Sequence, residues 1–310
     1  MLKKYILCFT IGFCLLALHE APAQNVPRRE FRCASAISNI ATTPFGNGLV
    51  AAYGSRLDVF HMRTNINLRT FEQHSGNITA ITVHPTLNRC VSADASGEII
   101  AWNTNDLSQV VHYQKAAGLP VTIRFEPDGN KFYVLLSNHT TLLEYTQNEP
   151  TPSATYTITQ SIDANWESRK GGTFFATSKM DIVRFQLENN TLKMVEKGKG
   201  DKKKLLGIKC INGNLYSIEE KKVTLWSNEQ KAVQSYESKE TLSDFAVNAT
   251  EKFIALVTTT GKISVLDTET KKNIFQNIET SAVKQIIFHP NEPLVIVRFE
   301  DGSVKSWILK

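Results

Sequence analysis

Two carboxylates of this sequence, Asp163 and Asp244, occupy positions that could support catalysis. Glycoside hydrolysis needs two carboxylates that face each other across a substrate. Among the residues that we expect to face a common axis, Asp163 and Asp244 are the only acidic pair, and Lys209 lies between them in the chain. Such a pair would suit a hydrolase or lyase acting on sugars or lactones. The alternative, which we favour, is a partly solvated set of ion pairs that binds no substrate.

The histidines show no metal-binding pattern. A metal-dependent lactonase or oxidase needs several histidine or carboxylate ligands that converge on one ion. The histidines after residue 23 are instead scattered along the chain, at His61, His74, His84, His112, His139 and His289. The sequence also lacks His-Glu-x-x-His, Gly-x-Ser-x-Gly, Cys-x-x-Cys and P-loop motifs. We therefore expect no catalytic residue, no metal and no cofactor.

Two lysine runs form a candidate binding patch. This basic patch consists of Lys202, Lys203, Lys204, Lys221 and Lys222. In a ring of repeated blades, the loops that carry the two runs share one face, so an acidic partner could dock there. Alternatively the lysines are solubilising loop charges, because two glutamates directly before the second run offset it. The formal net charge of +5 is too small and too interspersed to indicate nucleic-acid binding.

The elements that must position these residues recur along the chain. Residues 24–310 would divide into seven units of 41 residues. A large apolar or aromatic residue closes a short β-rich run in each unit, namely Phe60, Trp102, Tyr145, Phe185, Trp226, Leu266 and Trp307. A second marker, proline, follows the same period at Pro44, Pro85, Pro127 and Pro290. Two independent markers with one period predict seven structural repeats.

Each repeat has the composition of four short strands. Runs such as 78–83 and 131–136 are rich in β-branched and aromatic residues, and turn residues bound them. No segment keeps an apolar period of 3.6 residues for the length of a substantial helix. Four strands in about 41 residues are typical of a propeller blade, which needs neighbours on both faces. We predict an all-β fold, a seven-bladed β-propeller with four-stranded antiparallel blades.

The innermost strand of each blade should present alternate side chains to the central channel. Alignment on the proline marker gives, blade by blade, the pairs Asn39 and Ala41, Ala80 and Thr82, Thr122 and Arg124, Asp163 and Asn165, Gly207 and Lys209, Asp244 and Ala246, and Gln285 and Ile287. Trp166 departs from the register of its blade. It is therefore either a core residue or a candidate hot spot for binding.

The repeats resemble the WD40 family. The resemblance is clearest in the second repeat, with residues 74–76 reading His-Ser-Gly, 83–85 reading Val-His-Pro and 99–102 reading Ile-Ile-Ala-Trp. No Trp-Asp dipeptide occurs. The resemblance implies a structural hydrogen-bond tetrad of His, Ser, Asp and Trp, of which His74, Ser92 and Trp102 would be present. Ser96 would hold the Asp position, with Asp94 nearby. The resemblance also implies protein or peptide partners on the top face and rims.

The two ends of the chain should complete one blade together. The last repeat stops after its third strand, near Trp307, while a spare run at 27–32 precedes the first repeat. We expect that this run pairs as the outer strand of blade seven and closes the ring, which protects the strand edges.

Residues 1–23 have the three parts of a secretory signal peptide. Lys3 and Lys4 are followed by an uncharged, mostly apolar run at 5–18 and by the small-x-small site at 21–23. The run is too short to span a bilayer. We expect cleavage near Ala23, a single propeller domain at 24–310, and a secreted or periplasmic location. An uncleaved anchor is the alternative.

Three cysteines follow the signal, at Cys33, Cys90 and Cys210. An odd number excludes a complete disulfide framework. We interpret them as small apolar residues in strands, although a single Cys33–Cys90 bridge is possible.

Taken together, the sequence predicts a non-catalytic, extracytoplasmic platform for protein–protein interaction. We expect a monomeric propeller within a complex, with a protein or peptide partner, no nucleic acid and no membrane span. The alternative is a propeller enzyme, a hydrolase or lyase on sugars or lactones that uses top-face carboxylates. A carbohydrate- or surface-binding module is a third hypothesis.

Overall fold

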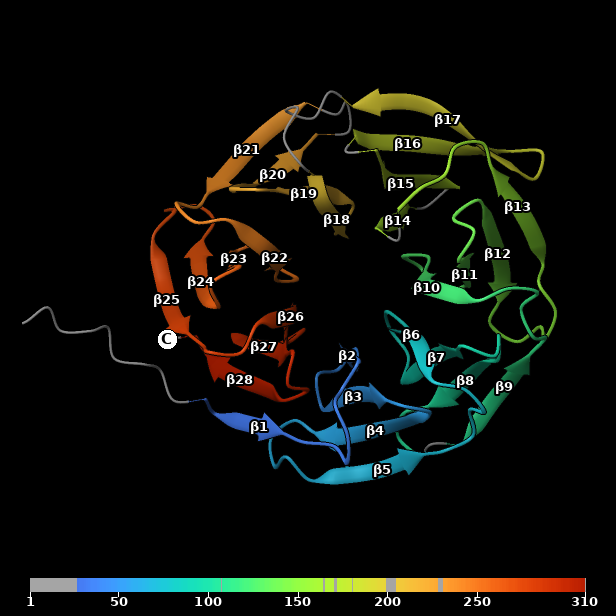
Figure 1. Ribbon diagram of the computed structural model, residues 1–310, viewed down its shortest axis with the longest axis horizontal. Helices are drawn as coiled ribbons and strands as arrows, with labels where there is room; N and C mark the ends of the chain where they lie inside the picture. Colours follow the sequence, from blue (N-terminus) through green and yellow to red (C-terminus); the bar gives the residue numbers. More distant parts are fainter. Residues whose placement is uncertain are drawn as a thin grey trace, which may run out of the picture.

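The described part of the chain folds into 28 β-strands and contains no helix. The computed structural model describes residues 27–106, 108–163, 165–169, 172–179, 181–198, 205–227 and 231–309. Within these ranges, no helix is long and apolar enough to cross a bilayer. The sheets form a ring of seven blades around a common axis (Figure 1). The prediction of an all-β, seven-bladed propeller is therefore confirmed.

Each blade has four antiparallel strands, which follow one another from the axis outward. Blade one contains β2 (Asn39–Thr42), β3 (Gly48–Tyr53), β4 (Arg56–His61) and β5 (Asn67–Phe71). Blade two contains β6 (Ile78–Val83), β7 (Arg89–Asp94), β8 (Ile99–Asn103) and β9 (Gln109–Tyr113). Blade three contains β10 (Pro120–Phe125), β11 (Lys131–Leu136), β12 (Thr141–Thr146) and β13 (Ala154–Ile158). Blade four contains β14 (Trp166–Arg169), β15 (Thr173–Ser178), β16 (Asp181–Glu188) and β17 (Thr191–Gly198).

The remaining blades follow the same order. Blade five contains β18 (Leu205–Ile211), β19 (Asn214–Glu219), β20 (Lys222–Trp226) and β21 (Ala232–Glu237). Blade six contains β22 (Leu242–Val247), β23 (Phe253–Thr258), β24 (Lys262–Asp267) and β25 (Asn273–Ile278). Blade seven contains β26 (Val283–Phe288), β27 (Leu294–Phe299), β28 (Val304–Ile308) and, outermost, β1 (Arg29–Phe31).

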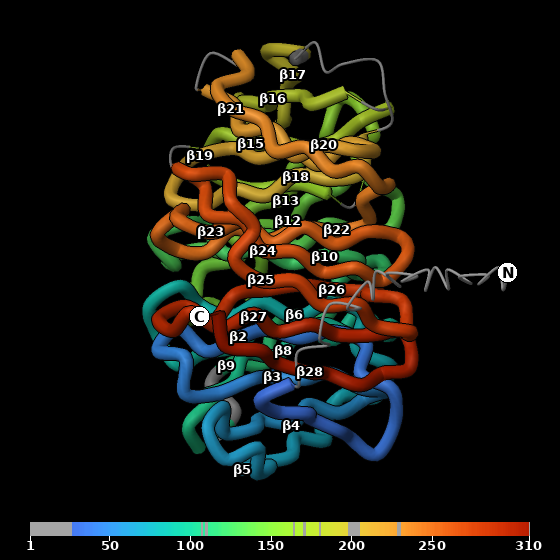
Figure 2. Tube along the Cα trace, turned by 90° about the vertical axis from the view of Figure 1, so that its left-hand side faces the viewer, coloured from blue at the N-terminus to red at the C-terminus, as the bar shows by residue number. Residues whose placement is uncertain are grey.

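The N-terminal strand closes the ring. β1 pairs antiparallel with β28, with Arg29 opposite Ser306 and Phe31 opposite Val304. Seen from the side, the blue N-terminal strands and the red C-terminal strands lie next to each other (Figure 2). Phe31 is fully buried, and its ring meets that of Phe60 in blade one at a centroid distance of 5.7 Å. The predicted pairing of residues 27–32 with blade seven is confirmed.

Two of the blades share one sheet. The outer strands β13 of blade three and β17 of blade four pair in parallel, with Thr157 opposite Thr191 and Ile158 opposite Leu192. Blades three and four consequently form a continuous eight-stranded sheet, whereas the other five blades are separate four-stranded sheets.

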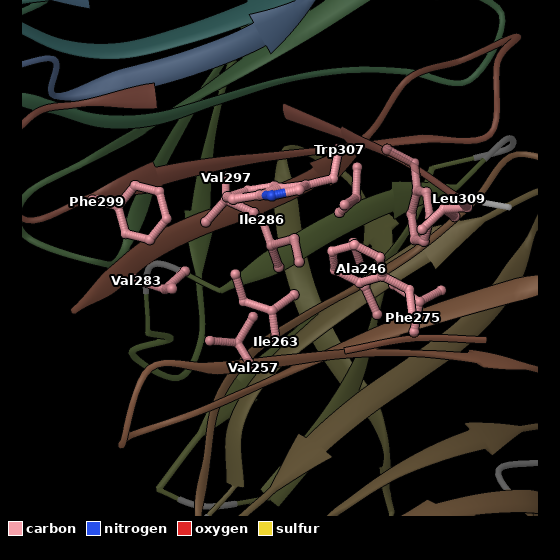
Figure 3. Packing of buried hydrophobic residues seen from close by; sticks show 14 residues of the cluster. Ala246, Val257, Ile263, Phe275, Val283, Ile286, Val297, Phe299, Trp307 and Leu309 are labelled. Carbon is pink, nitrogen blue, oxygen red and sulfur yellow. The ribbon is translucent and has the colours of Figure 1, made fainter. Parts of the chain in front are cut away.

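The hydrophobic core lies between the blades. One cluster joins blades six and seven, and Figure 3 shows Val257 and Ile263 facing Ile286 and Val297 beneath the Trp307 ring. The residues that mark the end of each repeat all lie on third strands, and six of the seven are buried. Because both faces of each sheet are apolar, a blade is stable only between two neighbours.

The antiparallel strand order gives the ring two different faces. We call upper the face with the loops that enter the inner strands and the turns between second and third strands. The lower face carries the turns between first and second strands and between third and fourth strands. One tight lower-face turn, at Asn212 and Gly213, has backbone φ angles of 47° and 82°, as a two-residue hairpin of type I′ requires.

Candidate functional site

The axis of the ring contains a cavity of about 810 Å³. Residues of blade one and of blades three to seven line it. Its charged side chains are of both signs, namely Arg124, Glu167, Lys209, Asp244, Lys284 and Arg298. This cavity is the place where an enzyme of this architecture would gather its catalytic groups.

Polar side chains of the inner strands bind the backbone of a neighbouring blade. Gln285 of blade seven makes two bonds to Ile40 of blade one, since its Oε1 accepts from the N–H at 3.1 Å and its Nε2 donates to the C=O at 2.9 Å. Asp244 of blade six accepts from the N–H of Ile286 in blade seven at 3.0 Å. Asn165 of blade four donates to the C=O of Leu206 in blade five at 3.2 Å. Thr79 of blade two donates to the C=O of Pro120 in blade three at 2.7 Å, and Lys209 of blade five donates to the C=O of Phe245 in blade six. These side chains thus hold the inner strands together.

Charges alternate around part of the cavity. Lys209 Nζ lies 3.0 Å from Asp244 Oδ1, and Arg124 Nε lies 3.8 Å from Glu167 Oε1. Blades three, four, five and six therefore contribute a cation, an anion, a cation and an anion in turn. Burial raises the pKa of the Glu167 carboxyl, although the positive charges of Arg124 and Lys209 oppose that shift. The arrangement fits the expected set of ion pairs better than a pair of carboxylates free to act on a substrate.

The predicted acidic pair is wrong in one member. Asp163 is exposed in a loop before β14, where its Oδ2 accepts a hydrogen bond from Thr177 at 2.9 Å. Glu167, four residues later, lines the cavity together with Asn165. The reason is the register of β14, which starts at Trp166 and places Asn165 and Glu167 toward the axis. In the sequence, the polar residues Asn165 and Glu167 lie on either side of Trp166. This alternation was the pattern that could have predicted that Glu167 faces the axis.

Trp166 is a core residue. Its side chain is 1% exposed, and its Nε1 donates a hydrogen bond to Thr122 Oγ1 in blade three. Two residues on, Ser168 donates to the backbone C=O of Phe125 at 3.1 Å, also in blade three. Trp166, whose position departs from the register expected for its blade, therefore connects blades three and four.

The structure brings His74, Ser92 and Trp102 together. His74 Nε2 lies 2.6 Å from Ser92 Oγ, and Trp102 Nε1 donates to the same oxygen at 2.8 Å. His74 Nδ1 lies 3.3 Å from Asp94 Oδ2, so Asp94 fills the acidic position that the sequence interpretation gave to Ser96. Ser96 instead donates from its hydroxyl to Asp94 Oδ1 at 2.8 Å. All four members of the tetrad are buried.

Hydrogen bonds from its own turn and from the loop before β6 hold Asp94 ionised. Burial alone would raise the pKa of Asp94, but the hydroxyl of Ser96 and the N–H groups of Gly76 and Glu98 donate to it and lower that pKa below its ordinary value. Burial lowers the pKa of His74 below 6.5, against the attraction of Asp94. His74, Asp94 and Glu98 also lie close enough to share a cation. N–H and O–H groups of the protein already donate to the carboxylates of Asp94 and Glu98. We therefore interpret the cluster as part of the structure of the turn rather than as a metal site.

Blade five contains a related pair that sequence comparison of the repeats overlooked. Trp226 Nε1 donates to Ser217 Oγ at 2.8 Å, in the same relation as Trp102 and Ser92. Glu219 is buried two residues after Ser217, at the position that Asp94 holds after Ser92. The spacing from the serine to the acid is therefore the signal that recurs.

The candidate basic patch is only partly visible. Lys202, Lys203 and Lys204 lie outside the described residues. Lys221 is exposed on the upper face, between β19 and β20. Lys222 Nζ lies 3.3 Å from Glu219 Oε2, so its charge is compensated within the protein.

Two histidines connect neighbouring blades on the lower face. His289 of blade seven lies with its Nε2 2.6 Å from the C=O of Gly46 in blade one. His84 of blade two packs onto Gly129 of blade three so closely that a Cβ on Gly129 would lie 2.3 Å from the His84 Nε2. His84 and His289 do not meet, because they lie on blades two and seven and blade one lies between those blades in the ring (Figure 1).

Cys33, Cys90 and Cys210 are free thiols. Burial raises the pKa of the Cys90 and Cys210 thiols to about 12, so both are protonated near neutral pH. Cys90 on β7 and Cys210 on β18 are small strand residues, as the sequence interpretation favoured, whereas Cys33 lies in the loop after β1 and forms no bridge with Cys90.

Comparisons with known proteins agree with this architecture. Residues 65–103 match the model of the family described as WD40, WD domain, G-beta repeat. A crystal structure of the β-propeller domain of Cps50 (Swd1) from Myceliophteria thermophila is similar, with a TM-score of 0.76 and 14% sequence identity. The similarity covers 91% of this chain and 99% of that one. No curated protein matches the sequence.

Proposed function

Since the chain is a WD40-like seven-bladed β-propeller, we propose that it is a non-catalytic platform that binds a protein or peptide partner outside the cytoplasm. WD40 propellers typically serve as interaction scaffolds, which supports a protein partner. The observation that carries the non-catalytic part is the use of the inner-strand polar groups. Gln285, Asp244 and Asn165 bond the backbone of the next blade, and so they stabilise the ring rather than face a substrate.

One of the two carboxylates of the cavity, that of Asp244, supports the same proposal. Both oxygens of Asp244 are engaged, Oδ1 by Lys209 and by the N–H of Phe245, and Oδ2 by the N–H of Ile286. A nucleophile or general base needs a free lone pair directed at the substrate. An extracytoplasmic location rests on the pattern of residues 1–23, which lie outside the described ranges.

For the binding surface we propose the upper face at blade five, where the basic patch would meet an acidic partner. The partner is first captured on the processed chain from its native envelope or medium and identified by mass. The same preparation shows whether the mature chain begins near Gln24, which tests the signal peptide. Binding of the identified partner is then measured as a function of salt for the wild type and for charge variants.

The variant Lys203→Glu/Lys204→Glu should bind the partner at least about tenfold more weakly, and its affinity should depend less on salt. The matched control is Lys271→Glu/Lys272→Glu, which makes the same charge change in an exposed lower-face turn and should bind like the wild type. Equal loss in both variants, or in neither, would place the contact elsewhere.

A further inference from the structure

Arg298 is an incompletely bonded cation in the wall of the central cavity. It lies on β27, opposite Gln285 in the strand pairing, and contributes to the lining. Its Nη1 donates to the backbone C=O of Ile37 at 3.2 Å. Its Nε is buried and has no hydrogen-bond partner among the described residues. A guanidinium has five N–H donors, and Nη1 is the one nitrogen of Arg298 that donates to a described residue.

Every other cation that lines the cavity has a carboxylate within 4 Å. Lys209 has Asp244 at 3.0 Å, Arg124 has Glu167 at 3.8 Å, and Lys284 has Glu300 at 2.8 Å. Arg298 has none among the described residues. Asp244 acts on it only at longer range, and the oxygens of Asp244 already accept hydrogen bonds from Lys209 and from backbone N–H groups.

Burial makes this missing partner costly. Removal of the Arg298 guanidinium from water lowers its pKa below the ordinary value, and the negative charge of Asp244 counters this effect. A charge inside a protein wall is destabilising unless a counter-charge and hydrogen bonds compensate it. The fork of a guanidinium matches the oxygen spacing of carboxylates and phosphates, which it can bind through two parallel bonds.

We propose that the central cavity binds a small oxyanion, of phosphate or carboxylate chemistry, on the guanidinium of Arg298. The cavity is large enough for such an ion, and the positive charges of its lining outnumber the negative ones. The site is independent of the partner surface proposed above, because it needs no other macromolecule.

Binding is tested by calorimetry on the full mature chain, at constant ionic strength set with chloride. Inorganic phosphate and succinate are titrated separately, so that the two arms distinguish phosphate from carboxylate as the preferred source. We expect one site per chain for at least one of them. Arg298→Gln should weaken that binding at least about tenfold, and Arg298→Lys should give an intermediate affinity because it keeps the charge but not the fork.

The control variant is Arg69→Gln, which removes an exposed arginine from the outer strand β5 and should leave binding unchanged. If Arg298→Gln does not fold, crystals of the wild type grown with selenate locate the ion by its anomalous signal. Titrations of both anions that equal chloride, or binding that survives Arg298→Gln, would overturn the proposal. So would a selenate found only on surface lysines.

Discussion

At the scale of single residues, the serine in the second strand is the centre of the buried polar network. Ser92 Oγ accepts from Trp102 and also contacts His74, whereas Ser217 accepts from Trp226 in blade five. Both serines are fully buried. The loss of a buried partner costs the desolvation of every group it leaves unpaired.

Ser92→Ala should therefore reduce the free energy of unfolding by about 2 kcal/mol, and Ser217→Ala by about 1 kcal/mol. The first change leaves two partners unsatisfied and the second leaves one. Urea unfolding, followed by tryptophan fluorescence and circular dichroism, measures both. A larger loss for Ser217→Ala would contradict the argument.

The buried His74 also predicts a pH dependence. Burial lowers the pKa of His74 in the folded protein, whereas the unfolded chain has the ordinary value near 6.5. Below that pH the unfolded state takes up a proton that the native state refuses, so stability falls as the pH drops. The slope is up to about 1.4 kcal/mol per pH unit for one such proton.

Unfolding free energies measured between pH 7.5 and 5.0 should accordingly show a shallower slope in His74→Gln than in the wild type. The depressed pKa of Asp94 contributes at lower pH, because its stabilisation is lost only as the pH falls through its folded pKa. Identical slopes in the two proteins would exclude His74 as the source.

At the scale of elements, the lower-face turns show how neighbouring blades are fitted to each other. Gly129 and Gly213 both have a positive φ, of 78° and 82°. A Cβ on Gly129 would collide with His84, whereas a Cβ on Gly213 would meet nothing within 4 Å. Substitutions at these two glycines therefore distinguish the cost of backbone strain from the cost of disturbed packing between blades.

Gly213→Ala should cost about 1 kcal/mol from the backbone alone, and Gly129→Ala about 2 kcal/mol more because the His84 ring must move. Thermal and urea unfolding measure both losses. The additional loss should shrink in the double variant Gly129→Ala/His84→Ala, as a double-mutant cycle would show. Equal losses for the two glycines would mean that His84 yields freely.

Local patterns predicted the elements well and the contacts between them less well. The repeat marker at Trp102 and the spare strand at 27–32 follow from strand texture and turn residues, which are local. The register of blade four depends on Trp166, whose partner Thr122 belongs to another blade. Asp94 was not assigned as the tetrad acid because its side chain is oriented by hydrogen bonds that it accepts from the N–H groups of Ser96 and Glu98. These contacts form only when the turn is folded.

At the scale of the whole molecule, ring closure depends on a short pairing. β1 contributes three residues to blade seven, and Phe31 packs from it into the core that blades one and seven share. Phe132 on β11 is equally buried but lies on a strand that is paired on both sides within a continuous sheet. The two phenylalanines therefore differ in topology rather than in burial.

Phe31→Ala and Phe132→Ala should each cost about 4 kcal/mol of stability. Under native conditions only Phe31→Ala should become sensitive to trypsin at Arg29 and Arg32, because β1 can then detach while the blades stay folded. Mass spectrometry of the fragments identifies the cut. Cleavage at these arginines in Phe132→Ala, or its absence in Phe31→Ala, would show that closure does not depend on Phe31.

The parallel pairing of β13 with β17 has a mechanical consequence. It fuses blades three and four on the side of the ring opposite the junction of β1 and β28 (Figure 1). The ring is therefore reinforced at blades three and four and weaker at the junction of β1 and β28. Opening fluctuations of the ring should begin at that junction, while blades three and four move as one rigid unit.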